Sequence, residues 1–130
     1  MEDRYLCKAK RKDNGEWVIG FYAYINKKHY IYTGQLIRSG LYDIAERFEV
    51  DPSTICQCTG LKDKNGKLIW ENDIVKINNS KVNTLITFRD FEIICTIPNE
   101  KYYKHRLEYD TEYEVIGNKF DNPELLESEE

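Results

Sequence analysis

Residues 57–77 read QCTGLKDKNGKLIWENDIVKI, and this stretch decides the class of fold. Asn65 and Gly66 form a turn signal, because both residue types accept the positive φ angles that a two-residue hairpin loop needs. Strand-forming residues follow a polar corner, namely Ile74, Val75 and Ile77. The pattern predicts a strand, a tight turn, a second strand and the start of a third.

Length and composition are typical of one folded domain. The chain has 130 residues, of which 41% are hydrophobic and 32% charged, a balance that suits a globular protein rather than a disordered one. Ten tyrosines and two tryptophans favour strands, where aromatic rings pack across neighbouring strands. We expect a single domain over residues 1–130, with a short C-terminal helix and an acidic tail over about residues 122–130.

Short runs of strand-forming residues recur along the chain, separated by turn residues. We expect strands at residues 5–10, 17–25, 30–33, 82–88, 91–97 and 113–116. Gly20, inside one of these runs, predicts a bulge or a close approach of another backbone. The expected fold is mainly β: a small, partly open SH3-like barrel or a bent antiparallel sheet with one or two short helices.

Residues 41–50 are ambiguous. Leu41, Ile44, Ala45 and Phe48 fall on one helical stripe, but part of the segment also fits a period of two. We expect a short helix at residues 41–47 that runs into an extended segment, and the strand interpretation stays open. At the other end, Asn122, Pro123 and Glu124 are typical of a helix start, so a helix is expected at residues 123–127.

Three segments, in the same order, resemble the YopX family of phage and prophage proteins. Residues 10–18 resemble the opening hairpin of that family, and residues 113–118 and 121–126 resemble its closing segment. The central segment carries the family signature, at Gly60, Leu61, Asp63, Asn65, Gly66, Glu71 and Asp73, with the aromatic residue Trp70 between its two halves. The resemblance implies one YopX-like domain in a protein of the bacterial host cytoplasm, and it carries no established catalytic residues.

The polar residues of the signature have structural explanations. Asp63 suits a turn, and Asp73 can accept backbone N–H bonds at a strand entry. Together with Glu71 they form a group of carboxylates that could bind a cation or transfer protons, but cation sites need more oxygen ligands than these. The family usually has glycine at the position of Asn72; if the corner needs a positive φ, asparagine is the least costly substitute.

No motif predicts catalysis or metal binding. Cys56 and Cys58 are spaced more closely than the usual zinc pair, in which about two to four residues separate the ligands, so we expect buried, reduced thiols. The other cysteines, Cys7 and Cys95, lie far away in the sequence. His29 and His105 are the available bases for a nucleophile, and no motif joins them to one. We therefore expect no enzyme, no metal and no cofactor.

Aromatic side chains are the best candidates for a binding site. Tyr22, Tyr24, Tyr30 and Tyr32 alternate along two neighbouring expected strands, and pairing these strands across a turn at residues 26–28 would set all four rings on one face. Packing within the sheet explains such a face best; the alternatives are a protein partner or stacked bases. Trp70 is expected to be exposed as well.

The charge balance and the aromatic residues favour a protein partner. The net charge is −4, which lowers the expectation of phosphate binding but leaves two local basic groups, Lys8, Lys10, Arg11 and Lys12 in one and Lys101, Lys104 and Arg106 in the other. We expect a non-enzymatic protein-interaction module that binds a host or phage protein. The alternative is a nucleic-acid-binding small β-barrel protein, and an enzyme ranks third.

Location and assembly follow from weaker signals. The N-terminal residues lack the basic start and apolar run of a secretory signal, and no apolar stretch is long enough to span a bilayer. We expect a cytoplasmic protein without a membrane partner. Exposed strand edges would allow a homo-oligomer.

Overall fold

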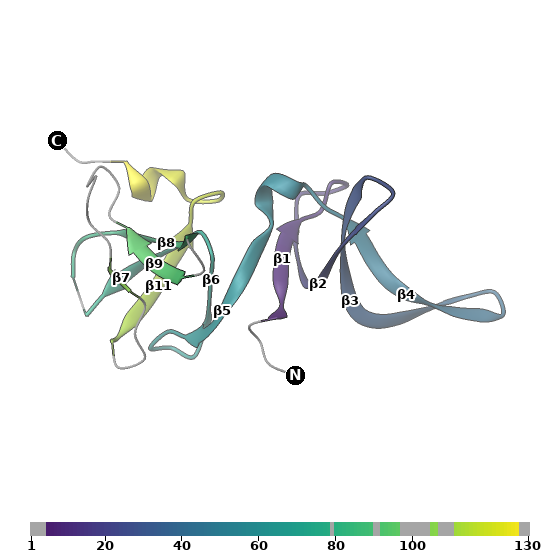
Figure 1. Ribbon diagram of the computed structural model, residues 1–130, viewed down its shortest axis with the longest axis horizontal. Helices are drawn as coiled ribbons and strands as arrows, with labels where there is room; N and C mark the ends of the chain where they lie inside the picture. Colours follow the sequence, from purple (N-terminus) through teal and green to yellow (C-terminus); the bar gives the residue numbers. More distant parts are fainter. Residues whose placement is uncertain (1–4, 79, 90–91, 97–104, 107–110, 128–130) are drawn as a thin grey trace. The chain divides into compact units, whose positions relative to one another are not determined.

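The computed structural model describes residues 5–78, 80–89, 92–96, 105–106 and 111–127. Nearly all regular structure in these ranges is antiparallel β-strand (Figure 1), and the predicted mainly β class is confirmed. The described sheets are open and do not close into a barrel. The SH3-like form of the prediction stays a prediction.

Contacts divide the chain into two compact units, Met1–Cys58 and Thr59–Glu130. Each unit has a hydrophobic cluster of its own. The expectation of one domain over residues 1–130 stays a prediction, because compactness does not show that either unit folds alone.

The N-terminal unit is a sheet with the strand order β4-β3-β2-β1, continued by the start of β5. Its strands are β1 (Cys7–Lys10), β2 (Trp17–Ile25), β3 (Lys28–Ser39), β4 (Tyr42–Glu49) and the first residues of β5 (Cys56–Lys62). One face carries the buried cluster of Ala9, Val18, Ile31 and Val50. A 3₁₀ turn, η2 (Pro52–Thr54), precedes β5 and is capped by Asp51, whose Oδ1 accepts the N–H of Ser53 at 3.0 Å.

The turn between β2 and β3 sets the register of this sheet. Asn26 and Lys27 have φ angles of 51° and 65°, and Ile25 pairs with Lys28. Two consecutive positive φ angles are the geometry of the primed two-residue hairpin turn, whose twist matches that of the strands. The loop therefore holds two residues, not the three that we expected at residues 26–28.

Gly20 lies where β3 comes very close to β2. A Cβ atom on Gly20 would stand 1.9 Å from the carbonyl oxygen of Tyr32, a distance that no side chain tolerates. The expected close backbone approach is confirmed.

The helix predicted at residues 41–47 is wrong. Residues 42–47 belong to β4, and Ser39 pairs with Tyr42 across a turn formed by Gly40 and Leu41. Gly40 has a φ of 62°, which glycine adopts without cost. Pairing with β3 satisfies the backbone and overrides the helical stripe, as tertiary context commonly overrides local propensity.

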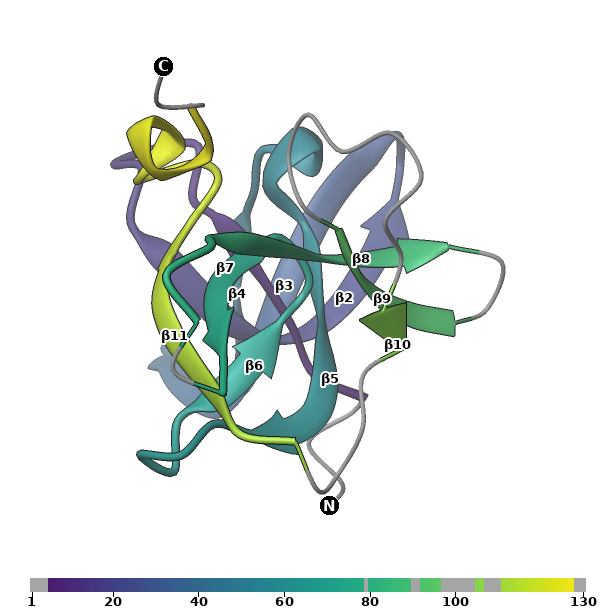
Figure 2. The same cartoon turned by 90° about the vertical axis from the view of Figure 1, so that its left-hand side faces the viewer.

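The C-terminal unit is built around a second antiparallel sheet with the order β10-β9-β8-β7-β11 (Figure 2). Its strands are β7 (Asp73–Ile77), β8 (Thr84–Arg89), β9 (Glu92–Thr96), β10 (His105–Arg106) and β11 (Tyr113–Asn118). The strand β6 (Leu68–Trp70) pairs with β5. The core consists of Ile69, Val75, Ile86, Cys95 and Tyr113.

The C-terminal segment forms a 3₁₀ turn, η3 (Pro123–Leu126), where a short helix was expected at residues 123–127. Its carbonyl at Leu125 accepts a bond from Asn83 Nδ2 at 2.8 Å. The acidic residues 128–130 lie outside the described ranges.

The loop between β5 and β6 differs from the predicted two-residue turn. Asp63 N–H donates to the carbonyl of Lys67 at 2.7 Å, and Gly66 N–H donates to the carbonyl of Asp63 at 3.0 Å. Gly66 has a φ of 81°. The loop is therefore a longer one in which glycine alone takes the left-handed conformation, while Asn65 does not.

We predict that Lys27→Gly raises the free energy of unfolding by about 0.5 to 1 kcal/mol, because a lysine in the left-handed region costs about 1 to 2 kcal/mol and glycine recovers most of it. Urea denaturation measures the change. Lys28→Gly, one residue further and inside β3, is the matched control and should destabilise. Equal effects of the two variants would contradict the role assigned to the turn.

Candidate interaction surface

The four tyrosines of β2 and β3 do not share a face, so the single aromatic face predicted from the sequence is wrong. Tyr22 pairs with Ile31 and Tyr24 with His29, whereas Tyr32 pairs with Phe21. Directly paired residues lie on the same side of a sheet, and a shift of one residue reverses the side. The two-residue turn makes this shift relative to the expected three-residue turn.

Tyr22 and Tyr24 form a small exposed cluster with His29. Their side chains are 40% and 60% exposed. The hydroxyl of Tyr22 lies 2.6 Å from His29 Nδ1, and the ring of Tyr24 lies 4.8 Å from the histidine ring. They lie on the same side of the sheet as Ile31, and Tyr24 and His29 are direct cross-strand neighbours. Cross-strand packing within the sheet therefore accounts for part of this cluster.

Tyr30 and Tyr32 lie on the opposite side, where they contact Arg47. The guanidinium carbon stands 4.0 Å from the centre of the Tyr30 ring and 5.9 Å from that of Tyr32. Arg47 Nη1 donates to the Tyr32 hydroxyl at 3.1 Å. Both rings are half-buried, which makes this a packed cation–π group rather than a free aromatic patch.

Trp17 extends the same side of the sheet and was not singled out from the sequence. The ammonium groups of Lys8 and Lys10 lie 4.7 Å and 5.4 Å from its ring centre. The register of β1 and β2, with Lys10 opposite Trp17, brings these groups together. Alternation along residues 17–25 is enough to place Trp17 on the same side as Phe21. Only the pairing of β1 with β2 shows that the two lysines lie there too.

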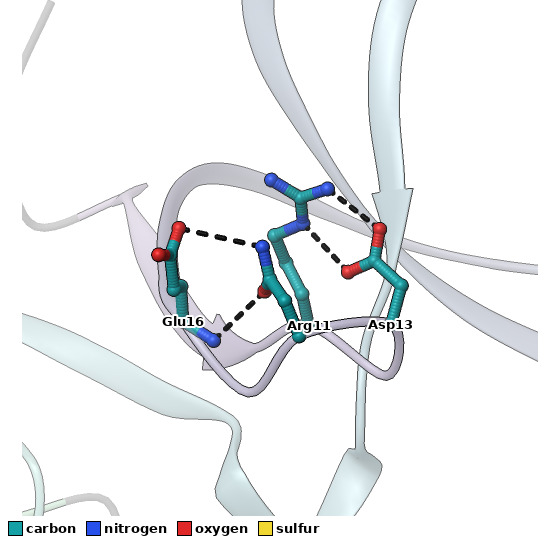
Figure 3. Close-up of polar contacts among 4 residues, drawn as sticks. Arg11, Asp13 and Glu16 are labelled. Atoms are coloured by element: carbon teal, nitrogen blue, oxygen red, sulfur yellow. Dashed lines mark hydrogen bonds and ion pairs between the residues drawn. The ribbon is translucent and has the colours of Figure 1, made fainter.

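The other two cations of the first basic group are held by carboxylates. Arg11 Nε and Nη2 donate to the two oxygens of Asp13 at 2.9 Å and 2.6 Å (Figure 3). The neighbouring Glu16 accepts a side-chain bond in the same turn. Lys12 pairs with Glu49 at 3.1 Å. Of the second basic group, Lys101 and Lys104 lie outside the described residues, and only the backbone of Arg106 is described.

The β3–β4 hairpin continues beyond the rest of its sheet (Figure 1). The pairing of β3 with β2 ends at Tyr32, while its pairing with β4 runs on to Ser39. We call residues 34–45 the arm. At its base the register shifts between Tyr32 and Leu36, and Gly34 there has a φ of 88°.

The arm exposes apolar side chains on both of its faces. The pair Ile37 and Ile44 lies on one face, where the side chains are 43% and 50% exposed. Leu36, on the other face, is 69% exposed, and Leu41 at the tip is 87% exposed. The arm does not follow from the sequence pattern, because residues 41–47 also fit a helical stripe. The available signal was the apolar residues on both sides of Gly40: Leu36 and Ile37 before it, and Leu41, Tyr42 and Ile44 after it.

Trp70, predicted to be exposed, is buried: only 6% of its surface is accessible. The signature half that precedes it is also structural. Thr59 Oγ1 donates to the carbonyl of Ile69 at 2.7 Å, and Gly60 has a φ of 80°. Leu61 packs against the core of the C-terminal unit. The signature therefore supports the fold and presents no aromatic contact.

Asp63 is the polar centre of the C-terminal unit. One carboxylate oxygen accepts the N–H groups of Asn65 and Lys67, both at 2.9 Å, and the other accepts the N–H of Val115 at 3.0 Å. Burial opposes ionisation and is the largest single influence, but these backbone donors together outweigh it and lower the pKa of Asp63. One side chain thus ties the β5–β6 loop to β11.

Asp73 and Asn72 shape the corner before β7. The Asp73 Oδ2 atom accepts the N–H of Trp70 at 2.8 Å, as expected for a carboxylate at a strand entry. Asn72 has a φ of 72°, and its N–H donates to the carbonyl of Ile86 at 2.7 Å. The corner does need a positive φ, the condition that the sequence left open, and asparagine supplies it. Glu71 is half-buried beside them.

The described cysteines are free thiols, and three of them are buried: Cys56, Cys58 and Cys95. Burial raises the pKa of Cys95 to about 12, which disfavours the thiolate that nucleophilic attack requires. In the described ranges no three His, Cys, Asp or Glu side chains gather as a metal site would need. Those ranges also hold no helix of the length and apolarity that crossing a membrane requires.

Comparison with known proteins places the chain in a family. A family model described as YopX protein matches residues 7–127, nearly the whole chain and both compact units. No curated protein matches the chain.

We predict that Asp63→Asn lowers the free energy of unfolding by about 1 to 3 kcal/mol at neutral pH, because an amide cannot accept bonds on both of its atoms. The lowered pKa means that the carboxylate stabilises the fold above the ordinary value of 3.8, and that this stability is lost as the pH falls through the lowered pKa. The deficit of the variant should therefore shrink in acid.

Chemical denaturation at several pH values measures this deficit. Glu127→Gln is the matched control, since the exposed Glu127 carboxylate makes no described polar contact. A deficit that stays constant into strong acid would contradict the proposed role of the Asp63 charge.

We predict that Trp70→Ala costs about 3 to 5 kcal/mol of unfolding free energy, as for a buried aromatic side chain. Tyr24→Ser at an exposed position should cost less than about 1 kcal/mol. Thermal or urea unfolding compares the two. Similar losses would show that Tyr24 belongs to the packed core.

Proposed function

Because this chain belongs to the YopX family over residues 7–127, we propose that it is a phage or prophage accessory protein of the bacterial host cytoplasm. Its activity is that of a non-enzymatic protein-interaction module, and the arm is its contact element. The observation that carries this proposal is a two-stranded ribbon with exposed apolar side chains on both faces.

The physical argument starts from the stability of the arm. A two-stranded hairpin alone is marginal in water, and it gains stability when a third strand or another surface covers it. Leu36, Leu41 and Tyr42 leave 69%, 87% and 75% of their surfaces accessible. Covering such side chains releases about 25 cal/mol for each Å² of apolar surface removed from water. Exposed apolar side chains gathered on one element are typical of a protein contact.

The chemistry of the arm also fits a protein better than a nucleic acid. Its two charged residues, Arg38 and Asp43, have opposite signs and stand opposite each other in the strand register. Such a surface offers no excess of positive charge for phosphates.

A nucleic-acid-binding role is the second candidate, and it rests on a different surface. Trp17 with Lys8 and Lys10, and Tyr30 with Arg47, combine rings and cations on one side of the sheet, as in proteins that stack bases. The whole N-terminal unit is nearly balanced, with nine Lys and Arg against eight Asp and Glu, so this candidate ranks second.

We predict that a double variant, Leu41→Ser with Ile44→Ser, folds normally but loses its protein partner. Both residues are exposed, so the change in unfolding free energy should stay within about 1 kcal/mol. The tagged protein is used to capture partners from bacterial lysate treated with nuclease. The expected result is a stoichiometric protein captured by the unchanged chain and absent with the variant.

Val82→Ser is the matched control, because Val82 is an exposed apolar residue of the C-terminal unit at 44% exposure. It should leave capture unchanged. Loss of capture in both variants would contradict a role for the arm. Recovery that depends on nucleic acid and falls steeply with salt would favour the second candidate.

A further inference from the structure

The outer edge of β4 presents unpaired backbone groups. The β4 strand is the last strand of its sheet. The N–H of Val50 donates inward to His29 on β3, whereas the carbonyl of Glu49 accepts the N–H of Lys12 on the other side. Because this direction alternates along a strand, odd-numbered residues of β4 turn their N–H and C=O groups away from β3. No described strand pairs with these groups at Asp43, Ala45 and Arg47.

We propose that a second copy of this chain occupies that edge, by antiparallel pairing of β4 with the partner's β4 about a two-fold axis at Ala45. The inference rests on the proposed role of the arm as contact element and adds a second copy of the chain to its partners. A long exposed edge strand with apolar side chains is the usual template for such pairing, and a two-fold axis makes the contact self-complementary.

The charges of β4 select this register. With the axis at Ala45, Asp43 stands opposite the partner's Arg47, and Arg47 stands opposite the partner's Asp43. Both are residues with outward backbone groups, so each opposite-charge pair coincides with a hydrogen-bonded pair.

Neighbouring registers are less favourable. An axis at Glu46 places Glu46 against the partner's Glu46 and Asp43 against the partner's Glu49, which puts like charges directly opposite each other. An axis at Ile44 places Asp43 opposite Ala45 and forms no charge pair. Of these three registers, the one at Ala45 gains two opposite-charge pairs.

The side chains concerned are placed to make these contacts. The carboxylate of Asp43 is exposed and makes no described hydrogen bond or ion pair. Arg47 is exposed and uses one described N–H on Tyr32, and a guanidinium has further donors. The ring of Tyr30 against the guanidinium limits the freedom that Arg47 would lose on pairing.

The same register covers apolar surface. Tyr42, now 75% exposed, stands opposite the partner's Phe48. The pairing stops before Glu49, whose outward carbonyl already accepts the N–H of Lys12. Each two-stranded arm becomes part of a four-stranded sheet, which is the size at which strands are stable in water.

The test exchanges the two charges. Asp43→Arg leaves two arginines at positions 43 and 47, and Arg47→Asp leaves two aspartates, so each variant alone sets like charges opposite each other. Sedimentation equilibrium should show a dimer for the unchanged chain. For each single variant the Kd of the dimer should rise by roughly tenfold or more. An equimolar mixture of the two variants, and the double variant D43R/R47D, should dimerise again.

The equimolar mixture of the two variants is the decisive measurement. Arg47→Asp also removes the contact with Tyr30 and Tyr32, and an unfolded chain would not restore a dimer. Lys27→Asp is the matched control, because it reverses a charge in the exposed β2–β3 turn, away from the proposed contact. It should leave the dimer unchanged. Far-UV circular dichroism checks that each variant is folded.

Two results would overturn the inference: an unchanged chain that is monomeric at all concentrations, or an assembly that persists in both single variants. Neither result affects the proposed function, which depends on capture of a bacterial or phage protein by the arm. If the unchanged chain is monomeric and the double variant Leu41→Ser with Ile44→Ser still loses capture, the proposed function stands and the dimer is excluded.

Discussion

The two-residue turn at Asn26 and Lys27 is the constraint on which the N-terminal unit depends. It pairs Ile25 with Lys28 and thereby fixes which side of the sheet each residue of β2 and β3 occupies. Ile31 is placed on the side of the buried cluster, and Tyr30 and Tyr32 are placed opposite, against Arg47. A loop one residue longer would exchange these sides. A lysine in the left-handed region destabilises the turn, but the packing on both sides of the sheet in this register outweighs that cost.

In the C-terminal unit a buried carboxylate has a comparable role. Asp63 joins a loop to β11 through three backbone N–H groups. A few residues away, Asp73 closes the corner before β7 by accepting the N–H of Trp70. A single carboxylate that accepts several backbone N–H groups can fix the conformation of a whole loop. The family signature is thus largely a set of structural requirements, and this explains why it reports the fold more clearly than the function.

The arm contrasts with both of these features. Its strands hold each other by backbone pairing, but no third strand of the described chain covers Ile37, Ile44 or Leu36. The register shift at its base, with Gly34 in a left-handed conformation and Thr33 Oγ1 bonded to Glu46 at 2.7 Å, lets the ribbon leave the sheet as a separate element. Apolar surface that a chain does not bury in its own fold is available to another molecule. For this reason the arm, rather than the tyrosines, is the better basis for a function.

The sequence by itself determined the β class and the positions of most strands, and it marked Gly20, Asn72, Cys56 and Cys58 as special positions. These follow from local chemistry: β-branched and aromatic runs, residues that accept positive φ, and apolar thiols. Only the tertiary structure decided that residues 41–47 form a strand, that Trp70 is buried and that the tyrosines lie on two faces. Strand pairing is non-local, and one residue more or less in a loop reverses the side on which every later side chain lies. No pattern within a single strand carries that information.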